Sequence, residues 1–144
     1  MKKPIYFYEL IFMFLLGSLI YSLLEILFRG YTHWTMTILG GVTGAALYVI
    51  SSGRKPIFIQ CLYGTFIITA FELTAGIFVN IILHWDVWDY SDVPFNLLGQ
   101  ICLPFSVVWY VISLPALLLC RFVRETFSCS IIPHNTADSN RYEL

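Results

Sequence analysis

Charged residues are scarce in this sequence, since Asp, Glu, Lys and Arg make up only 12% of 144 residues while 58% are hydrophobic. Soluble domains are about a quarter charged, so a soluble fold of this size could not cover its surface with charge. The chain also lacks a Walker motif, a nucleophile elbow and a glycine-rich nucleotide fingerprint. Its net charge of −1 and the lack of a dense basic patch argue against nucleic acid as a partner.

What the chain does contain is long apolar runs. A helix needs roughly 20 apolar residues to cross the hydrocarbon core of a bilayer, and four runs meet or approach that length. The sequence therefore predicts an all-α integral membrane protein, a four-transmembrane-helix bundle within residues 1–124. The predicted helices cover about residues 5–28, 34–51, 57–83 and 97–120, with an outer interfacial loop at 84–96. Residues 125–144 are polar and lack periodicity, which predicts a disordered cytoplasmic tail.

The basic residues predict one orientation. All of them except Arg29 fall on the side of the termini: Lys2, Lys3, Arg54, Lys55, Arg121, Arg124 and Arg141. Residues 84–96 hold three aspartates and no Lys or Arg. By the positive-inside rule both termini are then cytoplasmic, and the aspartate-rich loop lies outside. The expected location is the bacterial cytoplasmic membrane, with the lipid bilayer as first partner.

The segment "WDVWDYSDVPFNLLGQ" begins at Trp85 in this outer loop. Trp85 and Trp88 are three residues apart, so one helical turn would hold both rings at the headgroup level as an aromatic anchor.

Ser91 or Asp92 can then cap the fourth helix, with Pro94 in its first turn. Asn96 and Gln100 would follow one turn apart, with their polar groups inside the membrane, and this pair indicates a function beyond anchoring.

Glu72 is the strongest functional candidate, because it lies near the middle of the third run and an ionisable group there is expensive. Gly76 and Asn80 follow at four-residue steps and form a polar, small-residue stripe with it. Ser18 and Tyr21 of the first helix lie at a similar depth, and no basic residue does. We therefore expect Glu72 to be protonated or hydrogen-bonded to hydroxyl groups of the first helix.

Glu25 precedes Arg29 by four residues, the favourable order for a helical ion pair. This pair is expected near the outer end of the first helix and can be purely structural. Glu9, near the inner end, can extend its carboxylate to the interface and is given no role.

Small residues and prolines mark two of the helices. Gly40, Gly41 and Gly44 predict close packing within the bundle, with a homodimer seam as the alternative. Pro104 and Pro115 are expected inside the fourth helix, where each can cause a kink.

No cofactor or metal is expected. Cys61, Cys102, Cys120 and Cys129 have no metal-ligand spacing, and no disulfide is predicted. His33 and His84 lie on the outer side, where Asp86 or Asp89 could join them at a metal, but two histidines from separate loops are a weak signal.

Two blocks carry a family resemblance: "RGYTHWTMTILGG", 29–41, and "WDVWDYSDVPFNLLGQICLPFS", 85–106, with "FELTAGIFVN" between them. Over about residues 5–120 the chain resembles small bacterial ABC-transporter permeases of the type IV, CmpB-like family, in a branch with a short first outer loop. The resemblance implies a compact multi-helix membrane protein. The inner connection "SSGRKP", 51–56, is short for a coupling helix, so transport would need a homo-oligomer or a partner subunit such as an ATPase.

The residues leave three interpretations open. The first is a permease-like, transport-related protein with a polar, outward-facing cavity, in which Glu72 responds to protons or binds a cation. Its predicted lining is Glu25, Arg29, Glu72, Asn80, Asp89, Asn96 and Gln100. The second is a non-catalytic accessory or regulatory subunit whose polar residues only fix the bundle. The third is an outer-leaflet enzyme in which Glu25, His33 and Asp89 are acid–base candidates.

Overall fold

A computed structural model describes residues 7–130 of the chain, of which residues 129 and 130 are placed by backbone alone. Its elements follow in the order α1 (Phe7–Arg29), α2 (Trp34–Ser51), α3 (Ile57–Gly76), η1 (Ile77–Ile82), β1 (Asn96–Leu97), β2 (Ile101–Cys102) and α4 (Leu103–Ser130). The π-helix η1 continues α3 without a break, so the two elements form one continuous helical rod. The four predicted spans are thus present, and most of their ends lie close to the predicted positions.

The first turn between helices is built from two local devices. α1 ends where Gly30 adopts a φ of +80°, a left-handed conformation that glycine tolerates and that terminates helices. α2 begins after His33, whose ring nitrogen accepts a hydrogen bond from the backbone N–H of Thr35. His33 therefore acts as the N-cap of α2.

The fourth helix begins at Leu103 rather than at about residue 97, so the predicted start is wrong. Residues 96–102 form a short antiparallel hairpin in which Asn96 pairs with Cys102. Leu98 and Gly99 both have positive φ in its turn, as a type I′ turn requires. Residues 83–95 are not helical, so the predicted helical turn through the tryptophans and the cap at Ser91 or Asp92 are also wrong.

α4 differs from the prediction at two further places. Pro104 lies in its first turn, where a proline leaves no carbonyl unpaired, so only Pro115 interrupts the helix interior. The helix continues to Ser130, whereas a disordered tail was predicted from residue 125. The predicted tail at 131–144 and the basic residues at 2, 3 and 141 lie outside the described residues.

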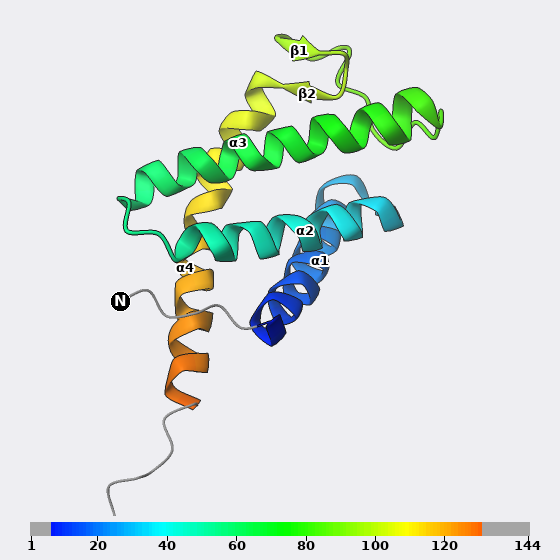
Figure 1. Cartoon of the computed structure of the whole chain (residues 1–144). Coiled ribbons are helices and arrows are strands. Elements are labelled where there is room, and N and C mark those ends of the chain that lie inside the picture. Colours follow the sequence, from blue (N-terminus) through cyan, green and yellow to red (C-terminus); the bar gives the residue numbers. More distant parts are fainter. Residues whose placement is uncertain (1–6, 131–144) are drawn as a thin grey trace, which may run out of the picture.

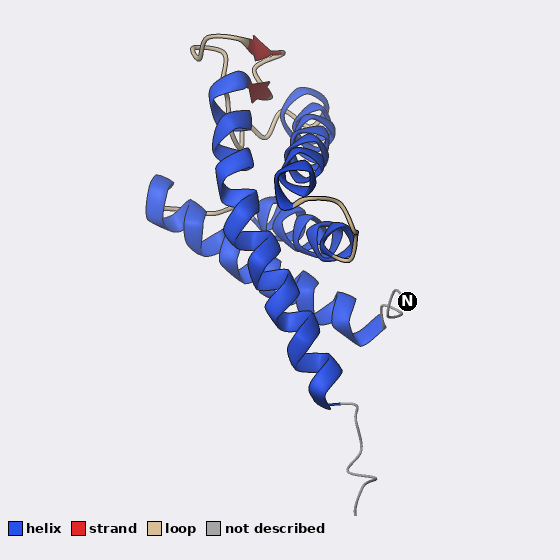
Figure 2. Cartoon of the chain, turned by 90° about the vertical axis from the view of Figure 1, so that its left-hand side faces the viewer, coloured by secondary structure: helices blue, strands red, loops and turns tan. Residues whose placement is uncertain are grey.

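The helices do not lie parallel to one another. α2 and the α3–η1 rod run side by side and antiparallel, while α4 crosses both of them obliquely (Figures 1 and 2). α1 packs against α2 through glycines: a Cβ on Gly17 would lie 2.6 Å from the carbonyl oxygen of Gly40 and 2.9 Å from the Cα of Gly44. The predicted use of Gly40 and Gly44 for packing within the bundle is confirmed.

Two buried clusters make up the core. One joins Met13, Leu47, Tyr48 and Ile68 to α4, and the other packs under the outer loop around Val79, Val87 and Trp88. Trp88 is only 6% exposed, so the prediction that it lies at the lipid headgroups is wrong, whereas Trp85 is 45% exposed.

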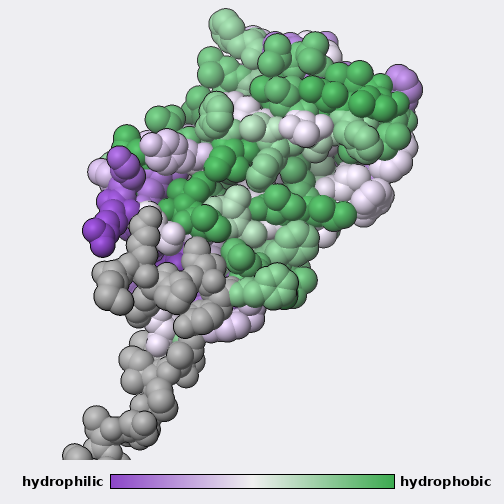
Figure 3. Space-filling model, in the orientation of Figure 1, coloured by the Kyte–Doolittle hydropathy of each residue, from purple (hydrophilic) through white to green (hydrophobic). Residues whose placement is uncertain are grey.

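The outer surface of the helices is hydrophobic. Figure 3 shows apolar side chains over most of the visible face, with hydrophilic residues gathered beside the connection between α2 and α3. Many large apolar side chains are more than half exposed, among them Phe7, Leu15, Phe66, Val111 and Phe122. Four helices within residues 7–130 are long and apolar enough to cross a membrane. A surface of this kind is suited to hydrocarbon rather than water.

Candidate functional site

A partly buried ion pair lies at the C-terminal end of α1. The Arg29 Nη1 donates to Glu25 Oε1 over 2.8 Å, and the Thr32 hydroxyl donates to the other carboxylate oxygen over 2.8 Å. Glu25 is only 8% exposed, and both of its carboxylate oxygens are paired, one with Arg29 and the other with Thr32. The ion pair predicted from the four-residue spacing is confirmed.

Arg29 also connects α1 to the outer loop. Its Nη2 donates to the hydroxyl of Tyr31 and, over 2.5 Å, to the backbone carbonyl of Val87. The guanidinium carbon lies 4.9 Å from the centre of the Tyr31 ring, within the range of a cation–π contact. One side chain therefore joins two segments that are 58 residues apart.

Asn80 makes hydrogen bonds to the same loop. It projects from η1, accepts from the Val87 N–H over 2.8 Å and donates to the Trp88 carbonyl and to Gln100 Oε1. Gln100 in turn accepts at its backbone carbonyl from the Trp88 indole N–H. A Cβ on Gly76 would lie 2.4 Å from Gln100 Oε1, so a glycine one turn before Asn80 makes room for the amide.

Four of the seven predicted site residues are thus linked through the backbone of Val87. Arg29, which is paired with Glu25, donates to the Val87 carbonyl. Asn80, which donates to Gln100, accepts from the Val87 N–H. We call these four side chains, together with Val87, the outer network. Sequence reasoning missed Val87 because its part is played by the backbone, which leaves no mark in residue type.

Glu72 lies apart from the outer network. It is 2% exposed, and the Trp109 indole N–H of α4 donates to its Oε2 over 2.8 Å. Of the two predicted alternatives, the hydroxyl partner from α1 is wrong, since the hydrogen bond comes from α4, and the protonated carboxyl stays a prediction. Tyr21 of α1 instead stacks on the Trp109 ring, with centroids 5.9 Å apart and planes inclined by 22°. Among the described residues, the ion pair in the outer network involves Glu25, and no Lys or Arg pairs with Glu72.

Tyr90 is a partly buried aromatic residue of the outer loop. Its ring stacks on Phe105 at the start of α4, with centroids 4.7 Å apart. Burial raises the pKa of the Tyr90 phenol, and the negative charges of Glu72 and Glu25 raise it further. The Tyr90 phenol is therefore neutral at physiological pH.

Asp89 and Asn96 make their hydrogen bonds within the loop and its hairpin. Both Asp89 bonds go to Ser91, from its backbone N–H and from its hydroxyl. The Asn96 amide nitrogen donates to the carbonyls of Ser91 and Val93, and its oxygen accepts from the Gly99 N–H. Both side chains are exposed, and Asn96 has both amide hydrogens paired with loop carbonyls.

The Ser91 hydroxyl and N–H hold the pKa of Asp89 below its ordinary value. Because the pKa is lowered on folding, this turn is stabilised at neutral pH, and the stabilisation is lost as the pH falls through the folded pKa. We expect Ser91→Ala to raise the Asp89 midpoint towards the ordinary value, measured by NMR of the side-chain carboxyl carbon. Ser106→Ala removes a hydroxyl that donates to the Cys102 carbonyl and makes no bond to Asp89, so it is the control. An unchanged midpoint in Ser91→Ala would contradict the assignment.

The three acid–base candidates of an outer-leaflet enzyme do not converge. The His33 ring bonds to Thr35 and packs against Trp34 and Trp85. Asp89 is bonded to Ser91 in the loop before the hairpin, and Glu25 is paired with Arg29. Within residues 7–130 no group of three metal-ligating side chains comes together.

The end of the molecule that holds the α2–α3 connection contains a buried acid to which the sequence analysis gave no role. Glu9 is 4% exposed and accepts a hydrogen bond from the Tyr48 hydroxyl over 2.8 Å, so the expectation that it extends to the interface is wrong. The Arg124 guanidinium lies 4.1 Å from the centre of the same ring and donates to the Tyr48 carbonyl. Arg121 bonds Gln60, which itself donates to two carbonyls of the α2–α3 connection. α4 is thereby fastened to that connection.

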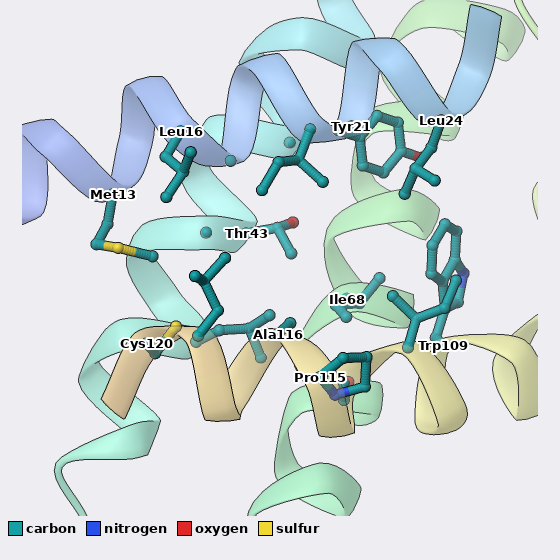
Figure 4. A pocket seen from close by; sticks show the side chains of 18 residues that line it. Met13, Leu16, Tyr21, Leu24, Thr43, Ile68, Trp109, Pro115, Ala116 and Cys120 are labelled. Carbon is teal, nitrogen blue, oxygen red and sulfur yellow. The ribbon is translucent and has the colours of Figure 1, made fainter. Parts of the chain in front are cut away.

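A chamber lies between the middle parts of α1 and α4 (Figure 4). Its volume is about 380 Å³, and α2 and α3 form its floor. We call it the lateral chamber; it is lined by Leu16, Ile20, Thr43, Leu47, Ile68 and Ala116, among others. None of the seven predicted site residues lines it. A polar cavity was predicted, and this one is apolar.

The fold and these polar clusters define a multi-pass integral membrane protein of the cell membrane whose buried polar groups gather at its two ends and around Glu72. The family model described as "Putative ABC-transporter type IV" matches residues 2–138, nearly the whole chain. The chain belongs to this family, as its motifs predicted, and is a transport-related membrane protein. No solved structure matches it.

Proposed function

We propose that the chain is a permease-like membrane subunit of a transport system, with both termini in the cytoplasm and a solute path that reaches Glu72 from the outer side. The observation that carries the proposal is the position of Glu72. It lies near the middle of the rod formed by α3 and η1, and its one described hydrogen bond comes from an indole N–H. An ionisable group at that depth costs about 2.5–3.5 kcal/mol on insertion scales, and such residues mark ion and proton pathways.

The outer network forms the entrance in this proposal. Its members join α1, η1 and the hairpin, so a change in the position of one segment must break hydrogen bonds to the others. The Tyr90 phenol in the outer loop interacts electrostatically with Glu72, which raises the pKa of the phenol. Asp89 and Asn96 then act by holding the hairpin over the entrance, because their hydrogen bonds are used within the loop.

The energy source would be a second subunit. The α2–α3 connection exposes Arg54 and Lys55 and is fixed to α4 through Gln60. An ATPase, or a further copy of the chain that completes its docking surface, would bind at this inner face. The short connection leaves little surface for docking by one copy alone.

A specific observation favours the accessory-subunit alternative. The outer network has its hydrogen bonds made within the chain, and the lateral chamber is apolar. A subunit that only scaffolds a complex would have this character, with Glu72 serving to fix α4 against α3.

Cysteine accessibility separates the two functions. In a cysteine-free background, Glu72→Cys is treated from the outer side of intact cells with a membrane-impermeant maleimide. We expect it to react more slowly than Asp86→Cys in the outer loop and much faster than Phe66→Cys, which is 75% exposed to lipid. The proposed solute path would bring water and the maleimide to position 72. The maleimide does not enter the lipid that is expected around position 66.

Two outcomes would count against the proposal. If Glu72→Cys reacts no faster than Phe66→Cys while Asp86→Cys is modified, no path reaches the carboxylate and the accessory function is favoured. If Arg54→Cys reacts from outside and Asp86→Cys does not, the orientation is reversed. Thermal unfolding of each variant in detergent establishes that the comparison is made on folded protein.

A further inference from the structure

Four basic side chains gather at the end of the molecule that holds the α2–α3 connection. Arg54 and Lys55 are exposed on the connection itself, and Arg121 and Arg124 belong to α4 and are partly buried. Within residues 7–130 no carboxylate lies at ion-pair distance from any of them. Figure 3 shows hydrophilic residues beside this connection on an otherwise largely apolar face. Partly buried cations are costly unless an anion compensates them.

The two arginines of α4 are neighbours of like charge. Arg121 and Arg124 are three residues apart, so they lie one turn from each other, an arrangement that destabilises a helix. Glu125 follows Arg121 by four residues, the less favourable order for a helical ion pair, and it does not pair with Arg121. A bound anion would relieve the repulsion between the two guanidinium groups.

Arg121 has hydrogen-bond donors to offer such an anion. Its Nη2 donates to Gln60 Oε1 over 3.2 Å, the one hydrogen bond that it makes to the described residues, whereas a guanidinium carries five N–H donors. The remaining Arg121 nitrogens are accessible, in contrast to the Nε of Arg124, which is buried without a partner. A planar guanidinium can donate to two oxygens of one phosphate group at the same time.

The position of Arg121 places it at the height of lipid headgroups. Gln60, its partner, also donates to the carbonyls of Gly53 and Lys55, so Arg121 is level with the turn between α2 and α3. A short turn between two spans lies in the headgroup region, which extends about 5–8 Å beyond the hydrocarbon core on each side. Phospholipid phosphates therefore lie within reach of Arg121, whichever way the protein is oriented.

An apolar stripe on α4 begins one turn from Arg121 and runs towards the middle of the span. Leu118, Leu114, Val111 and Val107 follow one another at steps of three and four residues, which puts them on one face of the helix, and all four are exposed. The ten residues from Arg121 to Val111 cover about 15 Å, the depth of the hydrocarbon of one leaflet. None of the four lines the lateral chamber, so the stripe faces away from it.

We propose that Arg121 binds the phosphate group of an anionic phospholipid and that one acyl chain of this lipid lies along the apolar stripe. The neighbouring cations, Arg54, Lys55 and Arg124, select the headgroup, because they attract a net negative charge and repel the ammonium group of a zwitterionic lipid. The site is separate from the outer network and does not depend on the proposed path to Glu72. Arg121 is also no part of the exposed turn at which a partner subunit is proposed to bind.

Photo-crosslinking of the purified full-length protein in phosphatidylcholine nanodiscs tests the proposal. Two probes carry the same diazirine-bearing acyl chain, one on phosphatidylglycerol and one on phosphatidylcholine, and each is added at trace mole fraction. Hydrogen bonds to a charged group predict that the phosphatidylglycerol probe labels the protein about tenfold more strongly. Peptide mapping should place its label on residues 107–118 of α4. Equal labelling by the two probes, or a label outside that segment, would overturn the proposal.

Two variants that each remove one positive charge separate the site from diffuse attraction. The wild type and both variants are compared in about 0.5 M salt, which screens charges more than several ångströms apart. Arg121→Gln should make the two probes label equally, whereas Arg54→Gln, at an exposed position of the same end, should keep the tenfold difference. Loss of the difference in both variants, or in neither, would contradict the assignment to Arg121. Thermal unfolding in detergent establishes that both variants are folded.

A soluble phosphate separates a lipid ligand from a free one. Glycerol phosphate shares the charged group of the phosphatidylglycerol probe but has no acyl chain to lie along the stripe. Millimolar glycerol phosphate in the aqueous phase should therefore leave the labelling by that probe unchanged. If it suppresses the labelling, the site takes free phosphate compounds, and the assignment to a lipid is wrong.

Discussion

Gly44→Leu is expected to prevent stable packing of α1 on α2. A Cβ at position 44 would lie 2.7 Å from the Met13 carbonyl oxygen and 3.0 Å from the Gly17 Cα, both of them backbone atoms that cannot rotate away. Overpacking against side chains typically costs 1–3 kcal/mol, and here two helices must separate. We therefore expect a loss of about 3 kcal/mol or more in the free energy of unfolding.

The measurement is unfolding of the purified protein in mixed micelles of increasing SDS content. Val42→Leu is the matched control, because it adds similar bulk to the same helix at a position that is 39% exposed to lipid. The control should unfold as the wild type does. If Gly44→Leu is equally stable, α1 does not lie against α2 in this register.

Asn80→Leu is expected to have the second largest effect. The side chain accepts from the Val87 N–H and donates to the Trp88 carbonyl and to Gln100, all in a buried setting. Leucine has a similar volume but leaves these three groups without their partner. Each unsatisfied buried group costs about 1–3 kcal/mol, so a total loss of about 3 kcal/mol is the lower expectation.

Asn96→Leu separates this effect from a general loss of amide groups. Asn96 also makes three hydrogen bonds to the loop, but it is exposed, and water can replace them. Its loss should cost under about 1 kcal/mol. Trp88 fluorescence gives a local readout, since the ring should become accessible to an aqueous quencher in Asn80→Leu only. Equal effects of the two variants would show that burial does not set the strength of these contacts.

The helical spans were predictable from the sequence because continuous apolar runs have few alternatives in a bilayer. The start of the fourth span was not. The residues Leu97, Leu98, Ile101 and Cys102 continue the apolar run into α4, so hydropathy cannot separate the hairpin from the helix. What separates them is the left-handed backbone at Leu98 and Gly99 and the hydrogen bonds that the hairpin makes with Asn96 and Tyr90.

The candidate site divides in the same way. Glu25 and Arg29 lie on one helix, where four-residue spacing fixes their contact, and this pair was predicted. The partner of Glu72 depends on how α4 lies against α3, and no local pattern contains that register. Asn80 and Gln100 were both selected as polar residues in apolar surroundings, but their bond to each other is a property of the folded loop.

The bond between Asn80 and Gln100 joins residues that are 20 positions apart, and this separation has a consequence for biosynthesis. At 5–20 residues per second a ribosome needs about 1–4 s to add the intervening segment. During that interval the third span has been made while the partners of its amide are still being synthesised. The apolar residues around Asn80 must therefore bring about membrane insertion without this bond, and the network is completed only when Gln100 has been added, just before α4.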